Sequence, residues 1–274
     1  MLGDQKIVIS NELNEQTLVH NTRTLENLCG ILKDQGFRCK YCIDVIPENN
    51  KFQTASYEIA SPVVCFSDQM LRSITNEYGN YALVMKKSWA KSKGLNPVLY
   101  FEEHSLLTGI LGELEYLSHA VESAAEITDA EDSVICRANS LEKSMYGLFG
   151  YIKSYQNKVK TGKIPENYIF YDEKEWRYVP HHSELKQEDK LELLISKERY
   201  EQNKEYFNSK AREYKLSFEI EDIEYVVLSH KKEIKELKKK LLGNTNISYE
   251  QLKGKIKIFD KIKRRRILYN FMKL

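Results

Sequence analysis

Residues 172–180 read DEKEWRYVP. In an extended strand, successive side chains point to opposite faces, so Glu173, Glu175 and Arg177 share one face while Trp176 and Tyr178 share the other. One face then carries acids beside a base, and the other carries aromatic bulk. Two interpretations stay open: the charged face is a solvated outer surface over a core, or it is the floor of a polar cleft.

The bulk composition is that of a globular protein. The chain has 274 residues, of which 42% are hydrophobic and 30% charged, so it can bury a substantial core. We expect a single domain over residues 1–274. The sequence has no apolar run of the roughly 20 residues that span a bilayer, and residues 1–10 do not resemble a signal peptide. We therefore expect a cytoplasmic protein without membrane contact, and an odd number of cysteines, five, predicts reduced thiols.

Charge is distributed unevenly along the sequence. Residues 231–274 contain 15 Lys and Arg against 4 Asp and Glu, a net charge of +11. This basic C-terminal segment permits an acidic partner, either nucleic acid or an acidic protein. Its sharpest part is KIKRRR at 261–266, which no interleaved aromatic residues accompany. A solvated strand face followed by a charged helix is therefore favoured over a nucleic-acid contact.

Short strand and helix patterns alternate irregularly, which favours an α+β fold with a mixed or antiparallel sheet over a doubly wound one. The pattern predicts two long helices over 104–127 and 133–159, forming a helical-hairpin insertion within 103–160. A further helical stretch is expected around 184–214. Strands are predicted over KIVIS at 6–10, TLVH at 17–20, SPVVCF at 61–66, YALVMKK at 81–87, NPVLYF at 96–101 and IEYVVL at 223–228.

Several shorter helices carry predicted end signals. Thr22 or Thr24 can cap a helix that presents leucines on one face, and Gly36 is expected to end it. Residues 69–79 are expected to form a helix that stops at Gly79. Ser88 is expected to cap a short helix that Gly94 ends.

Common catalytic and metal-binding motifs are absent from the sequence. CKYC at 39–42 has the spacing of half a zinc site, but there is no second pair of ligands nearby. Ordinary buried thiols are the favoured interpretation, and no metal is expected. Glycine-rich phosphate loops, GxSxG and HExxH are also missing.

His20 and Thr22 form the most suggestive pair of polar residues. They lie two positions apart at the end of a predicted strand, so they face the same way. An imidazole and a hydroxyl in that arrangement can bind the vicinal hydroxyls of a ribose. Many strands without any function carry the same pair, so a histidine that simply packs in the core is the alternative.

Ordered motifs along nearly the whole chain resemble the AbiGi family of abortive-infection phage-resistance proteins. They include TLVHNTRTLENLCGILKDQGFRCKYC at 17–42, YGNYALVMKKSWAKSKGLNPVLYF at 78–101 and EWRYVP at 175–180. The first motif departs from the family pattern at Asn21, where an aromatic residue is usual. The resemblance implies the antitoxin side of a two-gene toxin–antitoxin system, with a cognate protein from a neighbouring gene as partner.

The first motif alone is also similar to the opening of ADP-ribosyltransferase folds. That likeness implies a split ADP-ribosyltransferase-like core, with NAD as the substrate. His20 and Thr22 would bind the NAD ribose, Tyr78 or Tyr81 would stack on nicotinamide, and Glu175 would be the catalytic glutamate together with His20. A carboxylate is suited to that role because positive charge develops at the anomeric carbon in the transition state.

Two main functions therefore stay open. The first is transfer of ADP-ribose from NAD to a nucleic acid or protein, which requires His20 and Glu175 to share a cleft. The second is a non-catalytic antitoxin or regulator that binds a toxin, in which Glu175 and Arg177 form a structural ion pair. A sensing or structural subunit with neither activity is a third, less specific alternative.

Overall fold

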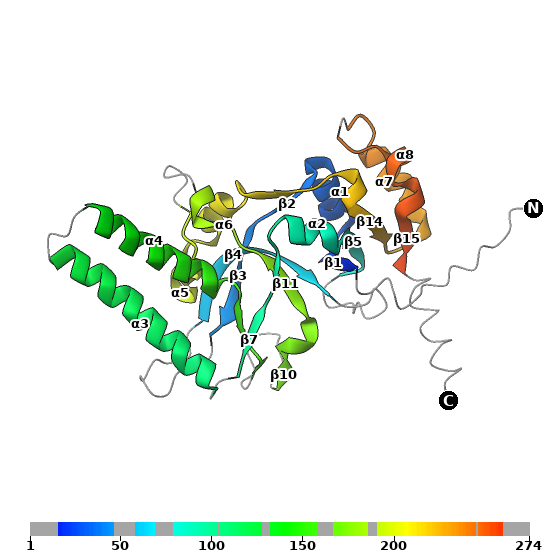
Figure 1. The fold of residues 1–274 in the computed structure, drawn as a ribbon. Helices are drawn as coiled ribbons and strands as arrows, with labels where there is room; N and C mark the ends of the chain where they lie inside the picture. Colours follow the sequence, from blue (N-terminus) through cyan, green and yellow to red (C-terminus); the bar gives the residue numbers. More distant parts are fainter. Residues whose placement is uncertain are drawn as a thin grey trace, which may run out of the picture. The chain divides into compact units, whose positions relative to one another are not determined.

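A computed structural model describes residues 16–46, 58–68, 79–102, 105–127, 132–157, 167–185, 191–244 and 246–259. Its contacts divide the chain into two compact units. Unit 1 comprises Met1–Phe37, Phe66–Gly94 and Ser217–Leu274, and unit 2 comprises Arg38–Cys65 and Leu95–Leu216. Each unit is assembled from separate segments of the chain. Helices and strands are mixed in both (Figure 1), as the expected α+β class requires.

Unit 1 contains a four-stranded run of sheet in the order β15-β14-β5-β1. Strand β5 pairs antiparallel with both β1 and β14, whereas β14 and β15 run parallel. Leu83, Met85, Val226 and Val227 are fully buried, because central strands covered on both faces are apolar without alternation. The strands are β1 (Thr17–Thr22), β5 (Tyr81–Lys86), β14 (Ile223–Leu228) and β15 (Ile256–Ile258).

Helix α1 (Leu25–Asp34) packs against β5 and against α7. Of the two candidate caps it is Thr24 that accepts a hydrogen bond from the Asn27 amide, at 3.1 Å. The prediction that Gly36 ends this helix is wrong: Gln35 is its C-cap, with φ of 45°. Gly36 instead begins the short strand β2 (Gly36–Arg38).

The other helices of unit 1 are short. The predicted cap Ser88 lies inside α2 (Lys87–Ser92), whose N-cap is Lys86 without a side-chain hydrogen bond. Near the C-terminal end, α7 and α8 follow β14, each joined to a 3₁₀ turn. These elements are η7 (Lys231–Glu233), α7 (Ile234–Lys240), α8 (Tyr249–Leu252) and η8 (Lys253–Lys255), whereas the 3₁₀ turn η6 (Ile220–Asp222) precedes β14.

Unit 2 is organised around β4 (Glu58–Ser67), most of which belongs to it. The first half of β4 pairs antiparallel with β3 (Lys40–Val45) and with β12 (Ile195–Ser196). Next in the sheet come β11 (Glu175–Tyr178) and β6 (Asn96–Pro97). The predicted strand over 96–101 is thus interrupted at Val98, and its second part, β7 (Leu99–Phe101), pairs in parallel with β8 (Ile152–Ser154).

The helical hairpin predicted for unit 2 is present as α3 (Leu106–Ile127) and α4 (Asp132–Phe149), which pack on each other. Its second helix is shorter than expected: α4 ends at Phe149, and the chain then forms β8 and β9 (Gln156–Asn157) instead of continuing to 159. Where the hairpin meets the sheet, helical side chains join a buried apolar cluster. That cluster comprises Ile46, Ile59, Leu111, Met145, Phe149 and Ile152.

The helical stretch expected around 184–214 is also shorter in the structure. It consists of α5 (Lys197–Gln202) and α6 (Lys204–Ala211), preceded by β12. Tyr200 and Phe207 from these helices pack against Tyr41 of β3. The remaining elements are β10 (Tyr168–Ile169), η4 (Phe170–Glu173), η5 (His182–Glu184) and β13 (Lys215–Ser217).

Some predictions fall on parts of the chain outside the described residues. These are the strand at 6–10, the helix over 69–79 apart from Gly79 itself, and the basic run at 261–266. In the described part of the chain, no helix has both the length and the apolar character needed to cross a membrane.

Candidate functional site

The charged face of β11 is its buried face. Glu175 and Arg177 are 7% and 1% exposed, whereas Trp176 and Tyr178 on the opposite face are half-buried. The strand therefore alternates as the sequence predicts, but the interpretation of its charged face as a solvated outer surface is wrong. A buried strand face that carries two charges needs partners for both, because an unpaired buried charge is strongly unfavourable.

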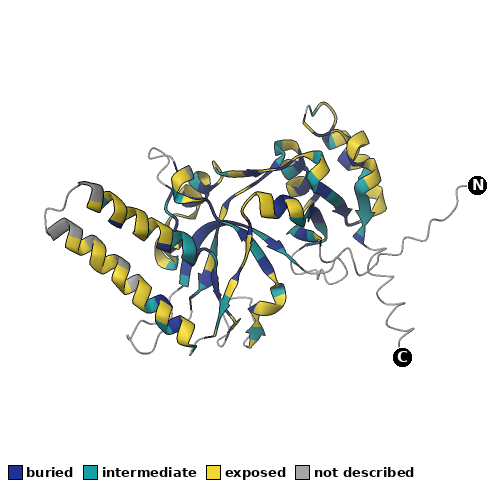
Figure 2. Cartoon of the chain, in the orientation of Figure 1, coloured by how far each residue is buried: buried dark blue, intermediate teal, exposed yellow. Residues whose placement is uncertain are grey.

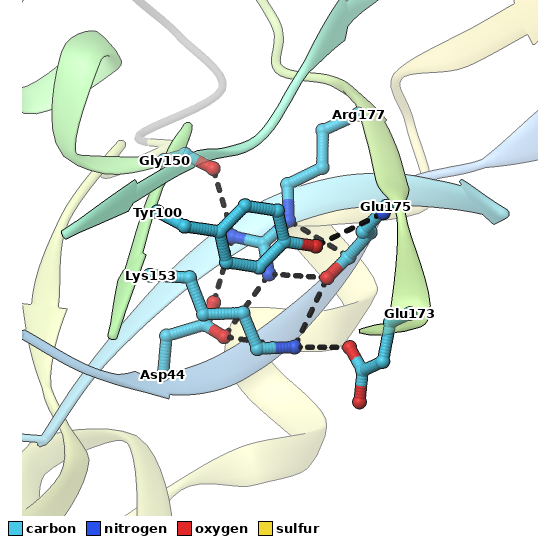
Figure 3. A network of polar contacts seen from close by, with 7 residues as sticks. All are labelled: Asp44, Tyr100, Gly150, Lys153, Glu173, Glu175 and Arg177. Carbon is cyan, nitrogen blue, oxygen red and sulfur yellow. Dashed lines mark hydrogen bonds and ion pairs between the residues drawn. The ribbon is translucent and has the colours of Figure 1, made fainter. Parts of the chain in front are cut away.

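Arg177 finds those partners around the whole of its guanidinium group (Figure 3). Nε and Nη2 donate to the two carboxylate oxygens of Glu175 at 2.8 and 3.1 Å. Nη1 and Nη2 lie 2.8 and 3.0 Å from the two oxygens of Asp44 in β3. Nη1 also donates to the carbonyl of Gly150 at 2.9 Å. These contacts use all five N–H groups of the guanidinium.

Lys153 of β8 extends the network toward its more exposed edge. Its ammonium group lies 3.0 Å from Glu175 and 2.6 Å from Glu173, and 3.9 Å from Asp44. It also lies 4.7 Å from the centre of the Phe170 ring, as a cation–π contact. Two cations and three carboxylates, from four separate strands and turns, thus form one connected cluster that we call the charge network: Asp44, Lys153, Glu173, Glu175 and Arg177.

The backbone around the charge network is also held. The hydroxyl of Tyr100 accepts a hydrogen bond from the Glu175 amide at 3.0 Å, and burial raises the pKa of Tyr100 to about 12. A side chain at Gly150 would put its Cβ 3.0 Å from both methyl groups of Val179. The glycine therefore lets the carbonyl that Arg177 uses approach β11 closely.

The electrostatics of the charge network favour the ionised forms of Glu175 and Lys153. Burial alone would raise the pKa of Glu175, but the charges of Arg177 and Lys153, with hydrogen bonds from Arg177 and Cys65, hold it well below its usual range. Burial likewise opposes the charge of Lys153, yet Glu175, Asp44 and Glu173 raise the pKa of its ammonium group well above normal. The charges thus stabilise one another as a closed set.

Two cysteines border the charge network. Cys42 of β3 and Cys65 of β4 are half-buried thiols that hydrogen-bond to each other, which lowers the pKa of Cys42 and raises that of Cys65. CKYC therefore contributes one thiol to this pair, while Cys39 is buried elsewhere in the core. Within the described ranges, no three His, Cys, Asp or Glu side chains are grouped so that they could hold a metal ion.

The residues predicted to bind NAD are distributed as follows. His20 and Thr22 lie on β1 of unit 1, and Thr22 pairs across the sheet with Tyr81 of β5. The predicted catalytic residue Glu175 belongs to unit 2, and Tyr78 lies outside the described residues. The structure therefore brings Thr22 and Tyr81 together on neighbouring strands.

The surroundings of His20 and Tyr81 are those of packed side chains. The His20 ring lies 4.8 Å from the ring of Phe37 and 5.4 Å from that of Phe66, at the edge of an aromatic cluster. The hydroxyl of Tyr81 donates to Glu233 at 3.0 Å. Burial and that carboxylate raise the pKa of Tyr81 to about 12.

Sequence reasoning identified Glu175, Glu173 and Arg177 as one charged face, and it missed Asp44, Lys153, Tyr100 and Gly150. Asp44 lies 133 residues from Arg177 along the chain, so no local pattern connects the two. Asp44 lies on β3, a strand that was not among the predicted elements.

The basic C-terminal segment is partly neutralised where the structure describes it. Lys240 forms an ion pair with Glu26 and lies 3.9 Å from Glu236, and Lys238 lies 3.6 Å from Glu250. The run at 261–266, which carries the densest charge, lies beyond the described residues.

Comparison with known proteins gives the family. A sequence model described as "Putative abortive phage resistance protein AbiGi, antitoxin" matches residues 36–229. The chain is 27% identical over 247 residues to the abortive phage resistance protein AbiGi of Lactococcus lactis subsp. cremoris, covering 79% of this chain and 96% of that protein. No solved structure matches the chain.

The fold is α+β, and a buried set of ion pairs lies within unit 2. By its sequence the chain belongs among the phage-resistance proteins. The chain is a member of the AbiGi family, whose description places it on the antitoxin side of abortive infection. The expected likeness to ADP-ribosyltransferases finds no counterpart in these comparisons.

Proposed function

We propose that this protein is a non-catalytic antitoxin of an abortive-infection system, which acts by binding a cognate toxin protein. The family description supports the antitoxin role. The non-catalytic role is supported mainly by the contacts of Arg177. All five of its N–H groups have partners within the protein, so none is left to bind a substrate.

Glu175 fits this proposal better than a catalytic role. A glutamate that stabilises a cationic transition state must direct its negative charge at the substrate. Here both carboxylate oxygens of Glu175 accept from Arg177, and one of them also accepts from Lys153. Its charge is therefore compensated within the fold, as expected for a structural ion pair.

ADP-ribose transfer from NAD stays the alternative prediction, with His20, Thr22, Glu175 and one of Tyr78 or Tyr81 as its site. No contact of the described residues favours it over packing. The basic segment 231–274 could serve either function by contacting an acidic partner, so it does not separate them.

The decisive experiment expresses the protein alone and together with the product of the adjacent gene. We expect the wild-type protein alone to be harmless and to leave cellular NAD unchanged, and to restore growth when the adjacent-gene product is toxic. Toxicity of the wild-type protein by itself, with NAD loss that His20→Ala and Glu175→Gln both abolish, would establish the enzymatic alternative instead.

A matched control separates loss of function from loss of folding in this experiment. Glu175→Gln is compared with Glu192→Gln, which alters a half-exposed ion pair with Arg199 in the same unit. If the charge network is structural, Glu175→Gln lowers neutralisation only in proportion to the loss of folded protein, measured as soluble protein and thermal stability. Glu192→Gln leaves both unchanged.

A further inference from the structure

The lysines of η7 and α7 gather on one side of this helical segment. Residues 231–240 contain six lysines and two glutamates, and three of the lysines are spaced at i, i+3 and i+7, which puts them on one face. All three are exposed, and Figure 2 shows exposed residues along the outer side of α7. We call them the α7 stripe: Lys232, Lys235 and Lys239. The opposite face is buried in unit 1, where Leu237 and Leu241 are 0% and 3% exposed.

The acidic side chains near the α7 stripe have other partners. Glu236 lies 3.9 Å from Lys240 and Glu250 lies 3.6 Å from Lys238, and neither of these lysines belongs to the stripe. Glu233 accepts hydrogen bonds from a tyrosine hydroxyl and a backbone amide. Within the part of the chain that the structure describes, no carboxylate forms an ion pair with a stripe lysine. The stripe therefore presents its positive charge to solvent.

The sequence adds further positive charge close to the start of η7. Strands β14 and β15 are parallel, with Leu228 opposite Ile258. The chain therefore leaves the sheet at the same end where it continues into η7 and where it continues into residues 260–266. These seven residues contain five Lys and Arg against one Asp. The sequence alone favours a solvated face for that run. The α7 stripe changes this balance, because a folded helix also holds uncompensated lysines on one face.

The character of the exposed surface indicates which acidic partner fits. Lysine is depleted in protein–protein interfaces, whose centres are apolar or aromatic, and helices that lie on membranes insert an apolar face beside their lysines. Helix α7 offers neither, because its apolar side is buried. In residues 231–244, all of which the structure describes, Leu242 is the one exposed large apolar side chain. A phosphate backbone, in contrast, is bound by cationic side chains through the release of counterions.

We propose that the α7 stripe is a nucleic-acid contact that binds the phosphate backbone of a DNA or RNA duplex. A lysine ammonium group is a point charge that fits a phosphate oxygen without reading a base, so the contact is independent of nucleotide sequence. The basic run at 261–266 adds charge to the same contact. This binding is separate from the proposed recognition of a toxin and does not rest on it.

The test measures binding of the full-length protein to fluorescently labelled DNA and RNA duplexes of one mixed sequence, by anisotropy over a range of salt concentrations. The stripe variant carries Lys232→Gln, Lys235→Gln and Lys239→Gln, which remove the charges and keep good helix formers. The run at 261–266 stays intact in this variant, so binding through that run alone would leave it like the wild type.

A charge-matched control separates the α7 stripe from net charge. It carries Lys40→Gln, Lys91→Gln and Lys93→Gln, at three exposed positions outside residues 231–274. The two variants therefore have the same net charge. Because every substituted side chain is exposed, both variants are expected to fold, which circular dichroism and a melting curve verify.

We expect the wild-type protein to bind at least one of the two duplexes, with an affinity that falls steeply as the salt concentration rises. The stripe variant should bind that duplex roughly tenfold more weakly or worse at low salt. Its slope of log K against log salt should be shallower by about 2–3, because each phosphate contact on B-DNA contributes about 0.9. The control should match the wild type. The duplex that binds more tightly identifies whether DNA or RNA supplies the phosphates.

Three outcomes would overturn the proposal. One is a folded stripe variant with the affinity and slope of the wild type. Another is an equal loss of binding in the charge-matched control, which would reduce the effect to net charge. The last is a wild-type protein that binds neither duplex. Binding to polyglutamate instead would then assign the stripe to an acidic protein, and binding to vesicles that contain phosphatidylglycerol would assign it to a lipid surface. None of these results changes the neutralisation of toxicity in co-expression, so the antitoxin function is tested separately.

Discussion

Arg177 and Glu175, two residues apart on β11, point into the protein together and join through two hydrogen bonds of 2.8 and 3.1 Å. Two further charges from other strands balance this buried pair. Asp44 contacts Arg177, and Lys153 contacts Glu175. The pair can therefore stay ionised in a site that is almost closed to solvent. Its energetic weight is testable by substitution.

Arg177→Met is expected to destabilise the protein strongly. It leaves Asp44 and Glu175 buried without their main counter-charge, and breaking a buried ion pair in this way costs about 3–5 kcal/mol. Arg199→Met is the matched control, because Arg199 also pairs with a carboxylate but is 56% exposed. It is expected to cost about 1 kcal/mol or less. Urea unfolding of both variants measures the difference. An equal decrease in the free energy of unfolding would contradict a large contribution of the charge network to stability.

The charge network also predicts a pH dependence of stability. The pKa of Glu175 is lower in the folded state than the value of about 4.3 expected in the unfolded chain. A lowered pKa contributes stability that is present above about pH 4.3 and is lost as the pH falls toward the folded-state pKa. The free energy of unfolding of wild type should therefore fall with decreasing pH below about 4.3 more steeply than that of Glu175→Gln. Parallel profiles for the two proteins would show that the carboxylate is not stabilised by folding.

Gly79 is predicted to be irreplaceable by alanine. It has φ of +108°, and an added Cβ would lie 2.2 Å from the carbonyl oxygen of Thr22. Strain and steric overlap together should cost at least about 3 kcal/mol. Gly94 provides the control, because its φ of +74° is also left-handed but its Cβ would meet no atom within 4 Å. Gly94→Ala should cost about 1 kcal/mol, and comparable melting temperatures for both variants would refute the close approach to Thr22.

Thr24 should contribute to unit 1 through its cap of α1. Thr24→Ala removes the acceptor for the Asn27 amide and is expected to lower stability by about 1 kcal/mol. Thr24→Ser keeps the hydroxyl and should recover most of that loss. If serine behaves like alanine, the methyl group of Thr24 rather than its hydrogen bond is responsible.

Local patterns predicted much of the fold because neighbouring residues determine them. The apolar runs of β1, β5 and β14, the Thr24 cap and the helical hairpin could all be recognised from sequence. The premature end of α4 at Phe149 could not, because residues 152–154 form a strand only by pairing with Leu99–Phe101. That pairing links segments about fifty residues apart, which periodicity cannot detect.

The candidate site could be predicted only where it depends on residues that are close in sequence. Alternation along β11 correctly grouped Glu175 with Arg177, but it could not decide that their face is buried. That outcome depends on Asp44 and Lys153, whose side chains reach the same point from β3 and β8. Burial of charge is a property of the assembled unit, so no single segment of the sequence encodes it.

Strand β5 pairs antiparallel with β14, which is translated much later, and this matters while the protein is synthesised on the ribosome. Strand β5 is complete at Lys86, but the strand that covers its second edge ends only at Leu228. For the time needed to translate the intervening chain, β5 offers an open edge that could pair with other nascent chains. We therefore expect slow or stalled translation between these strands to favour aggregation, so that the yield of native protein depends on elongation through this interval.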